Sequence, residues 1–138
     1  MIDIVIIPCS GRKKNTIQLA KDLYIGPYYK LAKQAALALR PMQWFILSAK
    51  YGIVNPNQQI GPYDLLMGSP GSVTEEKMME QAQEFRIANK ENVVLICPSR
   101  YTQPLLSIWP NAQTPLKGVG GIGFQFAKMK EIAKTGIL

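Results

Sequence analysis

Two polar segments of this sequence contain the side chains best suited to bind or transform a ligand. The first, PCSGRKK at residues 8–14, supplies a thiol, a hydroxyl and a run of cations. The candidates in it are Cys9, Ser10, Arg12 and Lys13. Backbone N–H groups and guanidinium forks bind oxyanions well, so the segment predicts a site for a phosphate or for the polar edge of a ring. An ordinary basic surface turn is the alternative.

The second segment runs from LSAKYG at residues 47–52 to PYD at residues 62–64. It supplies a hydroxyl, a cation, two aromatic rings and a carboxylate, from Ser48, Lys50, Tyr51, Tyr63 and Asp64. Aromatic faces stack on nucleobases and a carboxylate accepts a base N–H, so this set predicts base recognition. In the alternative, the two tyrosines pack the loop onto the core and Asp64 caps a turn.

Two further segments repeat parts of this chemistry. PSRY at residues 98–101 contains Arg100 and Tyr101 and echoes the first segment. GVGGIGFQ at residues 118–125 places Gly121 and Gly123 at the start of a helix, where free N–H groups and the helix dipole favour an anion. A tight turn that needs positive φ explains these glycines equally well.

Buried strands must position these segments. Apolar runs predict strands at residues 2–7, 43–48 and 93–97, with a short fourth strand near residues 112–114. Because helical patterns separate the strands, we expect a three-layer α/β/α domain with a four-stranded, mostly parallel sheet in the order 2-1-3-4. Ligands bind outside the carboxyl ends of such strands, so the polar segments should converge there and bring Cys9 close to Cys97.

Periodic apolar positions predict the helices. One helix runs from Pro27 to Arg40, with proline in its first turn. A capping box at residues 72–75 starts another that runs to about Ala88, and two more cover residues 99–109 and the stretch that follows the glycine-rich turn. Residues 49–71 have no clear period and form a long connection, which in compact domains tends to be functional.

Composition limits the classes of protein that fit. The 138 residues predict one α/β domain, residues 1–138, and a net charge of +7 favours polyanionic partners. Histidine is absent and the two cysteines are Cys9 and Cys97, which excludes a structural zinc site and a histidine-based triad. We expect no metal, cofactor or membrane partner, and the N-terminus lacks a secretory signal, which predicts a cytoplasmic location. Oligomeric state stays open.

Together the segments resemble a family of small bacterial and phage domains of unknown function. The resemblance rests on PCSGRKK, Ala20-Lys21-Asp22-Leu23-Tyr24, LSAKYG, PYD, Tyr101 and the PLxG…IG stretch from Pro115 to Gly123. It runs over nearly the whole chain and adds Asp22 and Tyr24 to the substrate-binding candidates. The PCS segment is also similar to the core of archaeosine synthase, which modifies a deazaguanine base in tRNA. The expected sheet order is similar to that of uracil-DNA glycosylases, although their histidine motif is absent here, which counts against base excision.

Three classes of function remain open. The first is a nucleobase- or nucleotide-directed enzyme that acts on an N-glycosidic bond or a modified base of DNA, tRNA or nucleotides. In it, Asp64 or Asp22 is the general base or oxocarbenium stabiliser, and Cys9, near Lys50, is the nucleophile or else a buried structural thiol. The second class is a non-catalytic nucleic-acid or nucleotide-binding accessory protein, whose phosphate contacts dominate its affinity. The third is a protein-interaction scaffold, which predicts scattered polar segments.

Overall fold

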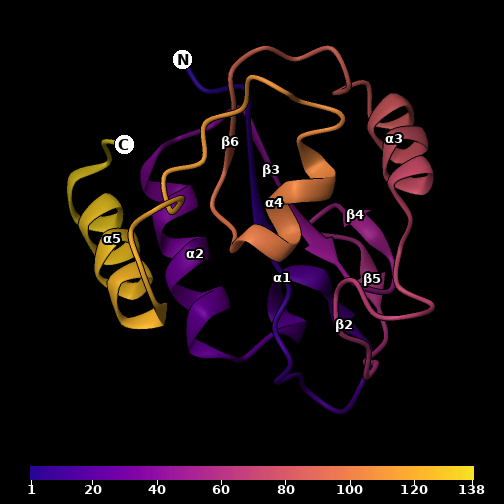
Figure 1. Ribbon diagram of the computed structural model, residues 1–138. Coiled ribbons are helices and arrows are strands. Elements are labelled where there is room, and N and C mark those ends of the chain that lie inside the picture. The colour runs from indigo at the N-terminus through magenta and orange to yellow at the C-terminus, as the bar shows by residue number, and fades with distance from the viewer.

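A four-stranded sheet with the order β4-β3-β1-β6 forms the centre of the computed structural model, which describes residues 1–138 (Figure 1). β1 (Ile4–Pro8) is parallel to β3 (Gln43–Ser48) and to β6 (Val93–Leu95), and β4 (Gly52–Val54) runs antiparallel to β3. Every residue of β1 is buried, as expected for a central parallel strand that is covered on both faces. The predicted α/β class and the four-stranded, mostly parallel sheet are confirmed.

The fourth strand is not where the sequence pattern places it. Residues 112–114 contribute one isolated bridge, in which Gln113 pairs with Val94 beside β6. The strand at the opposite edge, β4, lies within the connection that was expected to be irregular. A strand of three residues is too short to show alternation in the sequence, which explains why the pattern misses it. The three strands predicted at residues 43–48, 2–7 and 93–97 lie in the expected order, as β3-β1-β6, but the fourth strand is β4 beside β3 and not residues 112–114 beside β6.

The same connection contains a second short pairing. β5 (Gln59–Ile60) pairs antiparallel with β2 (Gln18–Leu19), which leads directly into the short helix α1 (Ala20–Leu23). The backbone N–H of Ala20 also donates to the carbonyl oxygen of Gln58, at 2.8 Å. These hydrogen bonds hold α1 against the long connection.

Three helices follow the predicted periodicity with small changes at their ends. α2 (Pro27–Ala38) begins with proline at its first turn, as predicted, and ends before Arg40, whose φ is 51°. α4 (Ser99–Leu105) is shorter than the expected helix. α5 (Ile122–Thr135) ends at Gly136, whose φ of 69° is the left-handed conformation that glycine adopts without strain.

α3 (Glu75–Glu84) is shorter than predicted at both ends. Its N-cap is Thr74, whose Oγ1 accepts a hydrogen bond of 3.1 Å from the backbone N–H of Lys77. The expected capping box at residues 72–75 is therefore displaced, because its acceptor is the threonine rather than the serine before it. At the other end, Arg86 has a φ of 60°, which stops the helix before Ala88.

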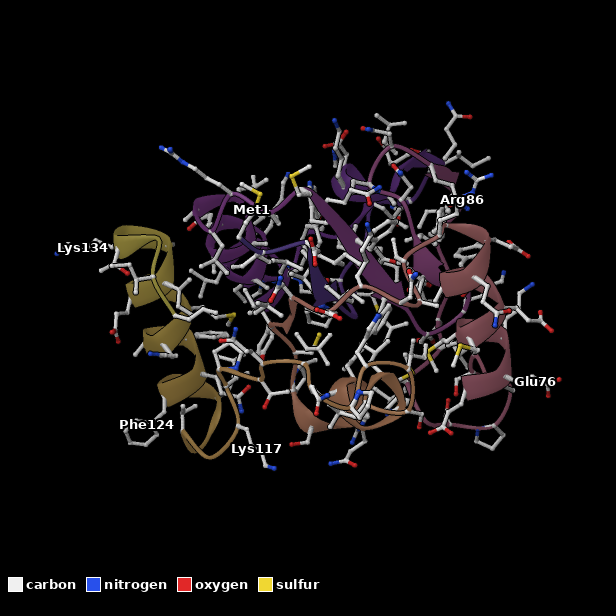
Figure 2. All side chains as sticks on the ribbon, turned by 90° about the horizontal axis from the view of Figure 1, so that it is seen from above. Met1, Glu76, Arg86, Lys117, Phe124 and Lys134 are labelled. Atoms are coloured by element: carbon white, nitrogen blue, oxygen red, sulfur yellow. The ribbon has the colours of Figure 1, made fainter.

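The helices contact different strands of the sheet. α2 packs against β1 and α5 packs along α2, whereas α3 contacts β4 and α4. The two views agree that α2 and α5 lie side by side, with α3 at the far end of the molecule (Figures 1 and 2). The three-layer arrangement stays a prediction. None of the helices is both long enough and apolar enough to cross a membrane.

Gly52 makes the turn from β3 into β4 and touches α3. Its φ is 78°, and a Cβ atom there would collide with the side-chain amide of Gln81. That amide accepts from the backbone N–H of Ile53 at 2.9 Å and donates to the carbonyl oxygen of Tyr51 at 2.7 Å. Gln81 therefore attaches α3 to the hairpin, and the hairpin needs glycine at this position.

Gly52→Ala is expected to lower the free energy of unfolding by about 1–3 kcal/mol, because alanine is strained at this φ and the Gln81 amide must move. Urea unfolding followed by circular dichroism measures the loss. Gly11→Ala is the matched control, since a Cβ atom at that position meets nothing within 4 Å. Equal losses in the two variants would show that the turn does not need glycine.

Candidate functional site

The carboxyl ends of the parallel strands lie side by side, and polar residues from distant segments meet there. The register pairs Pro8 with Leu47, so Cys9 and Ser48 leave the sheet at the same level. β6 lies on the other side of β1 and is followed by α4, which carries Tyr101. We call the hydrogen-bonded side chains gathered here the tyrosine cluster: Cys9, Tyr24, Ser48, Tyr63 and Tyr101.

A chain of hydroxyl groups forms one half of the tyrosine cluster. Ser48 Oγ donates to the hydroxyl oxygen of Tyr63 at 2.8 Å, and that hydroxyl is 2.7 Å from the hydroxyl of Tyr24. Ser48 Oγ also accepts from the backbone N–H groups of Lys50 and Tyr51, at 3.2 and 2.9 Å. Because Ser48 binds both the turn after β3 and the phenol of Tyr63, it holds the long connection against the end of the sheet.

The two cysteines have different environments. Cys9 Sγ lies 3.3 Å from the hydroxyl of Tyr101, and the residue is 7% exposed. Cys97 donates to the carbonyl oxygen of Ile6 at 3.4 Å, and burial, with a smaller effect from Cys9, raises its pKa well above the usual thiol value. Cys97 is therefore a buried, protonated thiol, whereas Cys9 faces the tyrosine cluster.

Burial keeps the phenols of the tyrosine cluster protonated. It raises the pKa of Tyr24, Tyr63 and Tyr101 above the ordinary phenol value, and the nearby thiol of Cys9 raises each of them further. All three hydroxyl groups are consequently neutral donors at physiological pH. A cluster of this kind offers hydrogen-bond donors to an acceptor atom or to a thiolate.

Cations lie over the aromatic rings at the outer side of the cluster. Lys13 Nζ is 4.3 Å from the ring centroid of Tyr63, and Lys50 Nζ is 5.2 Å from that of Tyr51. The rings of Tyr51 and Tyr63 are themselves packed edge to face, with centroids 5.6 Å apart. Lysines held at aromatic faces make this surface positive, which suits an anionic ligand.

Several other predicted site residues lie next to the cluster without joining its hydrogen bonds. Arg12, Arg100 and Asp64 are exposed, and each is adjacent in sequence to a residue of the cluster or of its lysine cover. Ser10 Oγ donates to the carbonyl oxygen of Arg12 at 3.0 Å, so its hydroxyl stabilises the turn after β1. The structure places these residues, and their roles stay predictions.

The glycine segment is the one predicted ligand loop with no contact to the cluster. Gly121 is the N-cap of α5, and both it and Gly123 are exposed, with nothing within 4 Å of a Cβ atom built on either. The residues that need glycine are Gly118 and Gly120, whose φ values are 76° and 113°. These conformations support the alternative that the segment is a tight turn.

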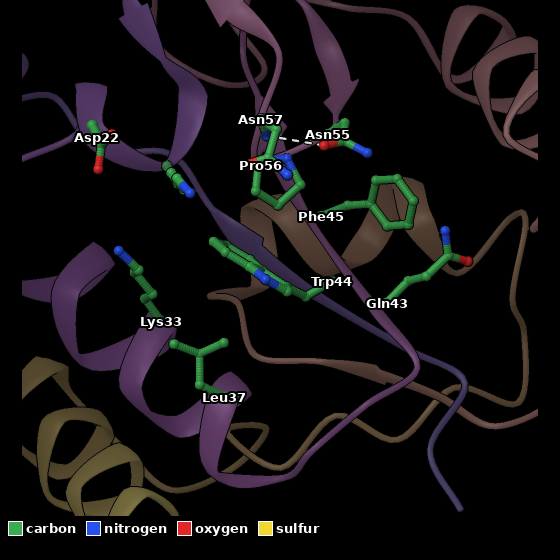
Figure 3. A pocket seen from close by; sticks show the side chains of 10 residues that line it. Asp22, Lys33, Leu37, Gln43, Trp44, Phe45, Asn55, Pro56 and Asn57 are labelled. Carbon is green, nitrogen blue, oxygen red and sulfur yellow. Dashed lines mark hydrogen bonds between the residues drawn. The ribbon is translucent and has the colours of Figure 1, made fainter.

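Two adjoining hollows lie between α1, α2 and β3. One, of about 540 Å³, is lined by Lys21, Asp22, Lys33 and Trp44, among others (Figure 3). The next, of about 410 Å³, shares Lys21, Asp22 and Lys33 with it and reaches Tyr24 of the cluster. We call the two adjoining hollows the lysine groove. Asp22, a predicted site residue, lies here and not among the phenols.

Sequence reasoning missed the other residues of the lysine groove. The apolar pattern of residues 43–48 predicts only that Trp44 belongs to a strand, whereas Figure 3 shows its ring between Lys33 of α2 and Pro56 beyond β4. Lys33 was recognised only as part of the polar face of its helix. The sequence offers only a tryptophan at the start of the strand at residues 43–48 and lysines on the polar face of the preceding helix, and nothing in it places the two together.

The side chains of this region do not form a metal-binding site. The structure contains no group of three or more cysteine, aspartate or glutamate side chains that could hold a metal ion together. The donors that do converge are a thiol, hydroxyl groups and lysines, which suit organic and anionic ligands.

Comparison with known proteins identifies the family. Residues 4–131 match the model of a family of unknown function, DUF6884, so the chain belongs to that family. It is similar to the uncharacterised protein YfjM of Bacillus subtilis (strain 168), with 28% identity over 88% of this chain and 88% of the relative. No solved structure matches significantly. The predicted membership of a family of unknown function is thereby confirmed.

Tyr63→Phe is expected to lower the free energy of unfolding by about 1–3 kcal/mol, because it leaves the hydroxyls of Ser48 and Tyr24 buried without their partner. Thermal and urea unfolding measure the loss. Tyr51→Phe is the control, since it removes one long hydrogen bond of 3.3 Å to the carbonyl oxygen of Gly61. A Tyr63→Phe variant as stable as Tyr51→Phe would mean that the hydroxyl chain adds nothing to stability.

Stability should fall in alkaline solution. The folded protein keeps its buried phenols protonated, whereas the unfolded chain loses those protons above its ordinary pKa of about 10. The unfolded state therefore binds fewer protons there, and the free energy of unfolding decreases as pH rises through and beyond that value. Urea unfolding on either side of that pH tests this, with Tyr63→Phe expected to show a weaker decrease. An equal pH dependence in the two proteins would refute the assignment to Tyr63.

Proposed function

We propose that this protein is a nucleobase- or nucleotide-directed enzyme that acts on an N-glycosidic bond or a modified base of DNA, tRNA or nucleotides. One observation carries the proposal: a thiol, three phenols and a lysine from distant segments gather where parallel strands end. Ligands of open parallel sheets bind at this edge, near the point where the strand order reverses. The convergence also argues against a scaffold with scattered polar segments.

The side chains divide into binding and reacting groups. Lys13 and Lys50 supply positive charge beside the aromatic rings, and Arg12 and Arg100 are available for phosphate. Asp64, exposed next to Tyr63, is the general base or the stabiliser of positive charge that develops on a sugar.

Cys9 is the nucleophile of this scheme. Its sulfur lies 3.3 Å from the Tyr101 hydroxyl, which stays protonated and so donates to the sulfur once the thiol has lost its proton. The sulfur would need the cluster to open, because Cys9 is 7% exposed.

A specific observation favours a second candidate, a non-catalytic nucleic-acid or nucleotide binder. The hydroxyls of the tyrosine cluster are paired with one another. The surface of the protein has four hollows, including the two of the lysine groove, and Cys9 lines none of them. A closed cluster then serves to hold the loops that display the cations, and phosphate contacts provide the affinity.

Incubation of the protein with modified and unmodified DNA, tRNA and nucleosides, followed by mass analysis of the products, separates the two candidates. For the enzyme we expect product formation that Asp64→Ala lowers by about 100-fold or more, the usual contribution of a general base. Glu84→Ala, which removes an exposed carboxylate of α3, is the matched control and should keep full activity. Intact binding without product in any mixture would retire the enzyme in favour of the binder.

A further inference from the structure

We propose that the lysine groove binds single-stranded nucleic acid, with the backbone along its lysines and a base against Trp44. The inference rests on the proposed function for the chemistry at the tyrosine cluster. It deepens that function by naming a polynucleotide as the substrate class. It uses residues outside that cluster, so the groove can be tested separately.

The groove is strongly positive. Its charged lining residues are Lys14, Lys21, Lys30 and Lys33, four cations, and Asp22, one anion, which leaves +3 of the chain's net +7 in one depression. Concave surfaces with charge of one sign focus the field and concentrate counter-ions. Such a surface attracts a polyanion more strongly than the same charges spread over a convex face.

The lysines of the groove have no carboxylate partners. The ion pairs in the structure join Lys77 with Glu80 and Lys128 with Glu131, both on other helices. Lys21 and Lys33 are half-buried as residues, and neither ammonium group has a carboxylate within 4 Å. Phosphate groups at nucleotide spacing would supply the missing counter-charge.

Trp44 gives the groove a second kind of contact. Its ring lies in the larger hollow across from Pro56, and Asn55 and Asn57 line the same hollow (Figure 3). An indole stacks on any base, and side-chain amides donate to or accept from base edges. A free phosphate or an acidic peptide would use the lysines but not the indole.

The size and course of the groove favour a single strand. Each hollow, about 540 and 410 Å³, falls in the range that holds a nucleotide-sized ligand. The bases of a duplex are stacked and paired, so they cannot reach an indole inside a hollow, whereas unpaired bases can. Tyr24 lines the smaller hollow, so a strand in the groove would pass beside a residue of the tyrosine cluster.

Fluorescence anisotropy with end-labelled oligothymidylate and oligouridylate tests the groove, in a series of salt concentrations. Lys21→Glu combined with Lys33→Glu is expected to weaken binding by about tenfold or more and to lower the salt slope by about 2, one for each lysine. Lys130→Glu with Lys134→Glu, two exposed lysines of α5, changes net charge equally and should bind nearly as the parent does. Equal losses in both double variants would overturn the proposal.

Trp44→Leu supplies the second test. It should weaken oligothymidylate binding by about 5- to 100-fold, as for the loss of one base stack, while leaving an abasic oligonucleotide unaffected. The lysine variants keep the test valid should the leucine variant not fold. Tighter binding of duplex than of single strand, or equal competition by polyglutamate, would reject the groove as proposed.

The two proposals fail in different ways. Groove-dependent binding without turnover rejects the enzyme and leaves the groove in place. If the protein turns over free nucleosides but binds no oligonucleotide, and Lys21→Glu with Lys33→Glu does not change that turnover, the groove is rejected and the enzyme remains.

Discussion

The parallel pairing of β1 with β3 on one side and β6 on the other decides which side chains of this protein meet. β1 is buried throughout, so its neighbours are held in register by hydrogen bonds that water cannot reach. Their carboxyl ends must then lie at one edge, and the polar residues that follow them are brought together whatever their separation along the chain. Cys9 and Tyr101, ninety-two residues apart, touch for this reason.

The tyrosine cluster shows how polar side chains are accommodated, through hydrogen bonds to one another, at the end of a buried sheet. Each hydroxyl of the chain from Ser48 through Tyr63 to Tyr24 has another as its partner, and no buried side-chain polar atom in the structure lacks one. Desolvation raises the phenol pKa values and so preserves the donors that this pairing needs. The result is a rigid support whose outer side presents Lys13 and Lys50 on aromatic rings.

Charge and shape divide the surface into two adjoining regions. At the carboxyl edge, lysines cover aromatic rings and closed hydroxyl pairs, which suits recognition of one base or nucleotide. Around α1 and α2, lysines surround a depression that contains Trp44, which suits a longer strand. Tyr24 belongs to both regions, so the two proposals describe a continuous path across one molecule whose family has no assigned function.

The sequence by itself determined the α/β class, the three parallel strands and the polar segments after them, because burial and helical periodicity are local patterns that neighbouring residues carry. It could not determine β4, because a strand of three residues is too short to show a period. It also could not determine the hydrogen bond between Tyr24 and Tyr63, because that bond depends on where the long connection folds back. Only the tertiary structure showed that Asp22 lines the groove and takes no part in the hydrogen bonds of the tyrosine cluster. It also brought Trp44 opposite Lys33, because the direction of a side chain follows from strand register and helix packing, which no short stretch of sequence contains.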